Sequence, residues 1–134
     1  TGFGKRTWSL ALSATGQVSV YVSADGGAFS LASTTATIEG AGYTNGQTLW
    51  VRAVFTFSGG GFTCPVSIST TGANYTALET ISVPAFTSTR VYQTSTPLTV
   101  GCRYHTGPTS GHADIFGGTV SLVDFFSGAY VYNI

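Results

Sequence analysis

Charge is scarce in this chain of 134 residues. Lys, Arg, Asp and Glu together make up 7% of the residues, and they sum to a formal net charge of +0. Because a polyanion is held mainly by clustered Lys and Arg, this composition argues against nucleic acid as a partner. Solubility must depend on hydroxyl and amide groups, which places such a surface near the limit of association at neutral pH.

Long apolar runs, a cysteine framework and helical periodicity are also lacking. No segment approaches the roughly 20 apolar residues needed to cross a bilayer, so membrane insertion is not expected. The two cysteines, Cys64 and Cys102, are too few for a disulfide scaffold. Both share the phase of neighbouring apolar residues and are expected to point inward, either as a disulfide or as two unpaired thiols.

What the chain does contain is a period-two pattern, in which apolar residues alternate with Ser, Thr and Gln. Val18, Val20 and Val22 show it most clearly. Side chains of a strand project alternately to opposite faces, so the pattern predicts half-buried strands of antiparallel sheets. The predicted strands are residues 6–13, 17–24, 29–37, 47–57, 63–70, 77–83, 90–93, 98–105, 113–126 and 129–134.

Glycine and proline mark the breaks between these strands. Asp25-Gly26 and Asn45-Gly46 supply the positive φ values that tight turns require. About ten short strands with regular turns predict a two-sheet sandwich or a barrel, in a single domain over residues 1–134. The prolines are expected at strand starts, at strand ends or in loops; they are Pro65, Pro84, Pro97 and Pro108.

Six segments of the chain are informative because of the order in which they occur. They are residues 6–10 (RTWSL), 16–26 (GQVSVYVSADG), 46–54 with WVR at the centre, 66–76 (VSISTTGANYT), 96–101 (TPLTVG) and 116–122 (FGGTVSL). Taken together, they resemble the concanavalin A-like, laminin-G-like jelly-roll modules of lectins, glycan-processing proteins and tailed-phage structural proteins. The resemblance implies an all-β fold, a two-sheet antiparallel jelly-roll sandwich.

The functional expectations follow from the same resemblance, and residues 50–52 and 74–76 are the segments most similar to the phage versions. It implies a non-catalytic structural or adhesion module on a virion surface, as a capsid decoration or tail protein. Such a module forms a homo-oligomer, contacts neighbouring virion subunits or binds a cell-surface glycan, and it needs no cofactor. The alternative is a free, extracellular carbohydrate-binding lectin domain.

The chain departs from this family near its start. Family members usually have strands before the one predicted around Trp8, whereas only residues 1–5 stand there in this sequence. Either the C-terminal strand alone closes the sandwich, or another chain covers an exposed edge, since unpaired edges invite pairing. The second possibility predicts an assembly.

One glycine-rich stretch gathers the side chains best suited to a ligand. Carbohydrate sites join an aromatic platform to directed polar groups, and these residues supply both kinds. The ligand-binding candidates are Arg103, Tyr104, His105, His112 and Asp114. Imidazole and carboxylate also bind transition metals, but the spacing matches no established metal motif, so no metal site is expected. A solvated connector between strands is the alternative.

The two tryptophans invite a sugar-stacking interpretation, but both are expected in the core. Trp8 shares its phase with Leu10 and Leu12. Trp50 is out of phase with most of its apolar neighbours, although a strand covered on both faces shows no clean alternation. An exposed position is the alternative for Trp50, and Arg52 beside it is either a surface charge or a hydrogen-bond fork at an interface.

Catalysis is not expected. Glycoside hydrolysis needs two carboxyl groups flanking the scissile bond, and the carboxylates of this chain are Asp25, Glu39, Glu79, Asp114 and Asp124. They form no cluster along one strand, and Asp25 and Glu39 look like turn residues. Since no nucleophile elbow, phosphate loop or paired-cysteine motif is present, a glycan hydrolase is the least favoured alternative.

Overall fold

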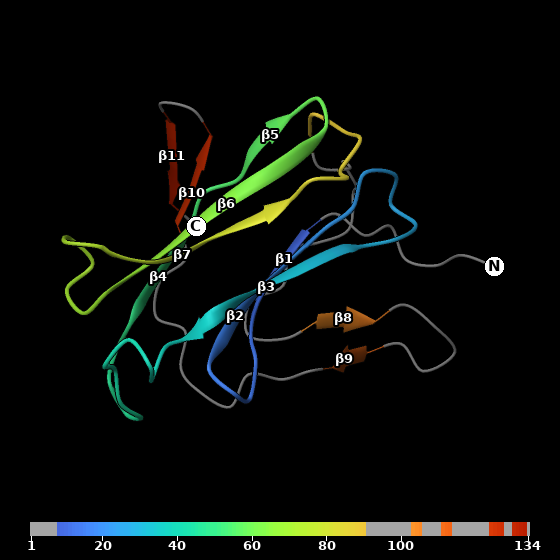
Figure 1. Cartoon of the computed structure of the whole chain (residues 1–134). Helices are drawn as coiled ribbons and strands as arrows, with labels where there is room; N and C mark the ends of the chain where they lie inside the picture. The colour runs from blue at the N-terminus through green and yellow to red at the C-terminus, as the bar shows by residue number, and fades with distance from the viewer. Residues whose placement is uncertain (1–7, 91–102, 106–110, 114–123, 128–129, 134) are drawn as a thin grey trace. The chain divides into compact units, whose positions relative to one another are not determined.

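The computed structural model describes residues 8–90 in full and the backbone of residues 103–105, 111–113, 124–127 and 130–133 (Figure 1). The chain divides into two compact units, one of Lys5–Thr94 and one of Thr1–Gly4 with Ser95–Ile134. The single domain over residues 1–134 stays a prediction. The regular structure of the described residues is entirely β, and its strand pairs are antiparallel. No helix among these residues has the length and apolarity to cross a membrane.

The first sheet of the larger unit has the strand order β1-β2-β3. Its strands are β1 (Trp8–Leu12), β2 (Gln17–Val22) and β3 (Ser30–Thr37). A tight turn joins β1 to β2 at Gly16, whose φ of 77° is one that glycine adopts without steric cost. The predicted alternation is confirmed on β2, because its three valines are at most 2% exposed.

The second sheet is built around one long strand. Its strands are β4 (Trp50–Ala53), β5 (Thr56–Ser58), β6 (Gly61–Ser69) and β7 (Thr76–Val83). Val66 of β6 pairs with both Ala53 of β4 and Glu79 of β7, so β4 and β7 lie on opposite edges of β6. β5 pairs with the start of β6, and β4 with its end.

Two expectations are wrong around Pro65. It lies inside β6 rather than at a strand start, and the strand predicted over residues 47–57 is split into β4 and β5. The N–H of Val54 donates to the carbonyl of Pro65 at 3.2 Å. In an antiparallel pair, the N–H and the C=O of one residue point towards the same neighbouring strand. Pro65 has no N–H, so it cannot donate a hydrogen bond back to Val54. The ladder along this edge is therefore interrupted opposite Pro65, between β4 and β5.

The two sheets pack face to face around one core, which makes the larger unit β-sandwich-like. The fully covered apolar side chains are Val18, Val20 and Val22 of the first sheet, Phe62, Cys64, Val66, Ile68 and Ile81 of the second, and Ile38 and Phe86 of the connections. The ring of Phe62 lies 5.4 to 6.1 Å from those of Phe55, Phe57 and Phe86. Contacts of this kind add to the burial of large apolar surfaces.

Cys64 confirms the expectation of an inward thiol, since its side chain is fully buried and carries a free sulfur. Burial raises the pKa of Cys64 to about 11, because a thiolate loses its hydration inside the core. The thiol is therefore protonated and unreactive at neutral pH. Cys102, its possible partner, lies outside the described residues.

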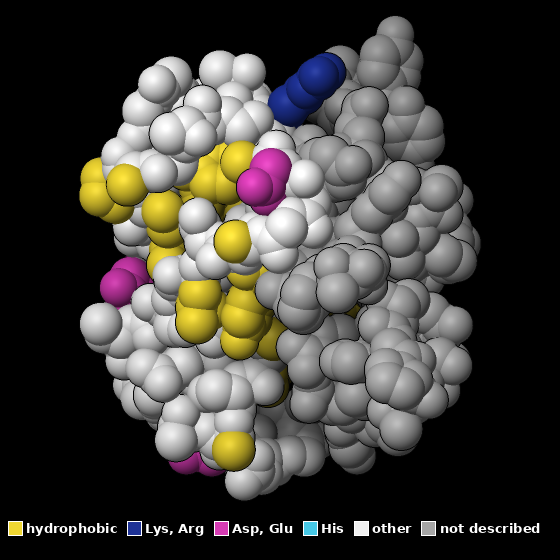
Figure 2. All heavy atoms as spheres, turned by 90° about the vertical axis from the view of Figure 1, so that its right-hand side faces the viewer, with side chains coloured by type: hydrophobic (Ala, Val, Ile, Leu, Met, Phe, Trp, Pro, Cys, Tyr) yellow, Lys and Arg dark blue, Asp and Glu magenta, His cyan; other side chains and the backbone are white. Residues whose placement is uncertain are grey.

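The described surface carries few charged side chains, as the composition predicts. Figure 2 shows one face, on which most of the described atoms are neither charged nor apolar, with apolar side chains gathered in a band. Exposed apolar side chains also occur on β1, the outermost described strand of the first sheet. Leu10 and Leu12 pair with the buried Val20 and Val18, yet they are 38% and 47% exposed.

The described residues of the smaller unit form two short hairpins. β8 (Arg103–His105) pairs with β9 (Gly111–Ala113), and β10 (Asp124–Ser127) pairs with β11 (Tyr130–Asn133). The ends of the predicted strands 98–105 and 113–126 thus coincide with β8 and β10. The predicted strand 90–93 lies outside the described residues except for Arg90.

Candidate functional site

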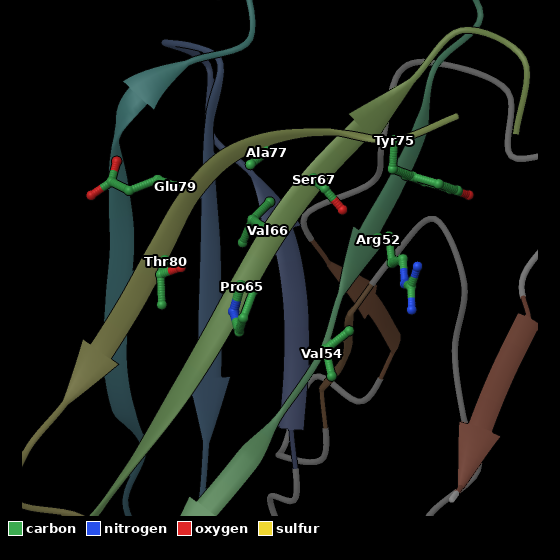
Figure 3. A pocket seen from close by; sticks show the side chains of 9 residues that line it. All are labelled: Arg52, Val54, Pro65, Val66, Ser67, Tyr75, Ala77, Glu79 and Thr80. Atoms are coloured by element: carbon green, nitrogen blue, oxygen red, sulfur yellow. The ribbon is translucent and has the colours of Figure 1, made fainter. Parts of the chain in front are cut away.

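A depression of about 400 Å³ opens on the second sheet of the larger unit (Figure 3). This volume lies within the ~300–1,000 Å³ typical of small-ligand sites. The residues that matter most for its chemistry are Arg52, Val54, Pro65, Ser67, Tyr75 and Glu79. They come from β4, β6, β7, the connection between β4 and β5, and the connection before β7.

Strand register places Arg52, Ser67 and Pro65 of this depression on the face that points away from the core. Arg52 pairs with Ser67, whereas the next pair along the strands is Ala53 with the buried Val66. Because side chains alternate between faces, Arg52 and Ser67 lie on the outer side of the sheet. Pro65 lies two residues before Ser67 on β6 and continues the same face.

Arg52 and Tyr75 together form one end of the depression. The guanidinium carbon of Arg52 lies 5.7 Å from the centroid of the Tyr75 ring, within the range of a cation–π contact. Arg52 is exposed and Tyr75 is half-buried. No described carboxylate forms an ion pair with Arg52, so this end is both positive and aromatic.

Trp50 lies on the same outer face, which makes the expected core position wrong. It pairs with Ser69, is half-buried and stands outside the core cluster. Its ring packs against the turn after β6, because a Cβ on Gly72 would lie 2.9 Å from the indole. Ser69 holds that turn by accepting the N–H of Gly72 at 3.0 Å. The phase of Trp50 is opposite to that of its apolar neighbours, and this phase correctly indicates the outer face.

Trp8 confirms the expectation that it faces the interior. It pairs with the buried Val22 on the edge strand β1. Its ring lies 6.4 Å from that of Phe55, at an angle of 53°. Trp8 is half-buried, and β1 is the outermost described strand of its sheet.

Glu79 borders the other end of the depression, but it pairs with the buried Val66, so its side chain lies on the core-facing side of the sheet. One oxygen accepts hydrogen bonds from the N–H of Thr35 at 2.7 Å, the N–H of Ala36 at 2.9 Å and the hydroxyl of Thr35 at 3.1 Å. Figure 3 shows Glu79 pointing away from Arg52, towards β3. Since β3 belongs to the first sheet, this side chain joins the two sheets at one edge.

A bulge in β3 provides the N–H groups that Glu79 binds. The register of β2 against β3 shifts within residues 17–19. The buried hydroxyl of Thr34 accepts the N–H of Val18 at 3.1 Å and donates to the carbonyl of Ala36 at 2.7 Å. A bulge leaves successive backbone groups unpaired by the ladder, and here the Glu79 carboxylate satisfies them.

These bonds make a prediction for Glu79→Gln. The Ala36 N–H is the main cause that lowers the pKa of Glu79, with Thr35 adding to it and burial partly opposing it. A lowered folded-state pKa stabilises the protein above the unfolded value near ~4.3, and this stabilisation is lost as pH falls through the folded value. E79Q should therefore be less stable than wild type in urea at pH 7, and the difference should shrink at pH 3.

Glu39→Gln is the matched control for this measurement. Glu39 is an exposed carboxylate in the turn after β3, so its replacement removes the same charge without removing the bonds to β3. E39Q should unfold like wild type at both pH values. An E79Q protein as stable as E39Q at pH 7, or a gap that stays constant down to pH 3, would contradict the role of Glu79.

Asp25, another carboxylate of the larger unit, is engaged within its own turn. Asp25 accepts the N–H of Gly27 at 2.7 Å and that of Ala28 at 3.3 Å, as expected of a turn residue. The Gly27 bond is the main cause that lowers the pKa of Asp25. Within the part of the chain that the structure describes, no three His, Cys, Asp or Glu side chains gather as a metal site would require.

Four of the five ligand candidates predicted from the sequence, Arg103, Tyr104, His105 and His112, lie on the paired strands β8 and β9. The register places Tyr104 opposite His112 and Arg103 opposite Ala113, so the stretch is a hairpin rather than one open loop. His105 ends β8 and pairs with Gly111. Asp114 lies outside the described residues. Ligand binding by this group stays a prediction.

The depression itself was missed at the level of sequence. Arg52 was noticed as a surface charge or an interface fork, but nothing linked it to Tyr75, which follows β6 on the far side of a turn. The available signal was the shared phase of Trp50, Arg52 and Val54, opposite to the core face. That phase identifies an outward face but does not identify the residues that join it from β6 and β7.

Comparison with known proteins adds no assignment. No protein-family model matches this chain, and neither a curated protein nor a solved structure matches it. The resemblance to concanavalin A-like modules therefore stays a prediction, and the chemistry of the site is argued from its geometry.

Proposed function

We propose that this protein is a non-catalytic structural or adhesion module of a virion surface, a capsid decoration or tail component built on a concanavalin A-like jelly roll. The order of its six motif segments supports the family assignment. Two antiparallel sheets around one core are compatible with such a sandwich. The proposed contacts are with neighbouring subunits or with a cell-surface glycan.

The engagement of Glu79 is the observation that carries the non-catalytic part. A general acid must hold a proton near neutral pH and present it to the substrate. Glu79 is the carboxylate that lines the depression, yet its oxygen accepts three hydrogen bonds from β3, which stabilise the ionised form. The arrangement favours binding over turnover.

The outermost described strands of the two sheets, β1 and β4, support a role in assembly. Leu10 and Leu12 of β1 are exposed on the side that faces the core, and Val51 of the edge strand β4 is 38% exposed on the corresponding side. Exposed apolar side chains along an edge strand favour association, and a surface with little charge opposes it weakly. These features fit a protein that works beside copies of itself or other subunits.

Sedimentation across a wide concentration range tests the structural role. We expect the wild type to associate, and the double variant Leu10→Ser, Leu12→Ser to raise the dissociation constant at least tenfold, since each buried leucine contributes ~1.5–3 kcal/mol. Leu31→Ser is the matched control, because Leu31 is 55% exposed and pairs with Tyr21 away from the core face. A wild type that stays monomeric at every concentration would contradict the structural role.

A free lectin domain is the second candidate, and the depression favours it. Tyr75 offers an aromatic ring, Arg52 a fixed fork of donors and Ser67 a hydroxyl, the combination that carbohydrate sites use. Selective, reproducible binding on a glycan array by a monomeric protein would decide for the lectin. Silence on the array together with association would decide for the structural module.

A further inference from the structure

The guanidinium of Arg52 lies over an aromatic ring and is not neutralised by a described carboxylate. Its central carbon lies 5.7 Å from the centroid of the Tyr75 ring, and this contact uses none of its N–H donors. Arg52 is exposed and forms no ion pair with a described carboxylate. A guanidinium in this state matches the two oxygens of a carboxylate, because its parallel N–H groups form two hydrogen bonds at once.

The other charged residue among those lining the depression does not compete for this position. Glu79 directs its carboxylate to the N–H groups of Thr35 and Ala36 on β3. Figure 3 shows it at the opposite end from Arg52 and Tyr75. The depression therefore has one unneutralised charge, which is positive and lies at a single end.

Between these two ends the depression is lined by both apolar side chains and hydroxyl groups, and a sugar ring can contact both kinds. Pro65, Val54 and Ala77 provide apolar surface for the C–H face of a ring, and Ser67 and Thr80 provide hydroxyl groups beside it. Pro65, Val54, Ala77 and Thr80 are exposed and Ser67 is half-buried, so a ligand would reach them without a change in the sheet.

We propose that this depression binds a sugar residue that carries a carboxylate, such as a uronic or sialic acid, with the carboxylate paired to Arg52. The proposal rests on the glycan contact suggested above and names the class of glycan. Exposed ion pairs contribute little by themselves, so binding of one sugar residue should be weak, with a dissociation constant on the order of 1 mM.

Ligand-observed NMR titration with matched sugars tests the proposal. The probes are methyl glucuronide, N-acetylneuraminic acid and, as the neutral counterpart, methyl glucoside. We expect at least one acidic sugar to bind roughly two- to fivefold more tightly than methyl glucoside, the range that one exposed ion pair supplies. Arg52→Gln should abolish this preference, and Arg52→Lys should retain only part of it, because an ammonium keeps the charge but not the fork.

Arg90→Gln is the control variant, since Arg90 is an exposed arginine outside the depression and its loss changes the net charge equally. R90Q should bind the acidic sugars as wild type does. Equal binding of acidic and neutral sugars, no binding of either acidic sugar, or equal losses in R52Q and R90Q would each overturn the proposal. Because association is measured separately by sedimentation, these outcomes leave the structural role to its own test.

Discussion

Replacing Phe62 with alanine is expected to lower the free energy of unfolding by about 3–5 kcal/mol. Phe62 lies on the central strand β6, is 1% exposed and contacts the rings of Phe55, Phe57 and Phe86. The substitution removes both the buried ring and the contacts it makes, and the surrounding sheets relax only in part. Urea unfolding followed by tryptophan fluorescence measures the loss.

A loss of this size is a large part of the ~5–15 kcal/mol that stabilises a typical domain. Phe62→Leu should retain most of the buried volume and keep the protein folded if the alanine variant fails. Leu31→Ala is the surface control, and its effect should stay within about 0.5 kcal/mol because that side chain is 55% exposed. Equal effects of F62A and L31A would contradict the proposed core.

Gly61→Ala should be the second most damaging substitution, although it adds only a methyl group. A Cβ at Gly61 would lie 2.5 Å from the carbonyl oxygen of Val83 and 3.1 Å from the Cα of Pro84. Both are backbone atoms, so relief requires the end of β7 to move away from the start of β6. We expect a loss of about 1–3 kcal/mol or more in the free energy of unfolding.

The neighbouring Gly60 supplies the matched control. A Cβ there would have open space around it, with nothing within 4 Å. Gly60→Ala should therefore change stability by no more than about 0.5 kcal/mol in the same urea titration. If both variants unfold together with wild type, the close approach of the two backbones at Gly61 is wrong.

Features that depend on short stretches of chain were predictable. The alternation of Val18, Val20 and Val22 identified a strand and its buried face, and the same pattern placed Cys64 inside. The turns were also identified correctly, since Gly26 and Gly46 have φ values of 82° and 87°. Both kinds of feature follow from the geometry of a few consecutive residues, which tertiary contacts did not override here.

Features that depend on a partner strand were not predictable. The division between β4 and β5 follows from Pro65, which belongs to a different strand and removes the donor that a continuous edge would need. Trp50 was placed in the core because its strand shows mixed phase. Which face a strand buries is set by its neighbours, so its own residues could not settle the position of Trp50.

In the candidate site, too, features of a short stretch were predictable and features that depend on a partner strand were not. Arg103 and its neighbours were selected because they are close in sequence, whereas Arg52 and Tyr75 meet only because β4 and the start of β7 flank β6. Glu79 was read as one of a few scattered carboxylates. Its attachment to Thr35 and Ala36 arises from a bulge in a strand of the other sheet.

The sequence by itself determined that this chain forms strands, where most of them turn, and which valines face the interior, because side-chain alternation and glycine turns are properties of the local backbone. Only the tertiary structure decided that Glu79 joins the two sheets, that Trp50 and Arg52 share an outer face, and that Tyr75 lies beneath the guanidinium. These arrangements depend on register and on the packing of one sheet against the other, which no single stretch of residues encodes.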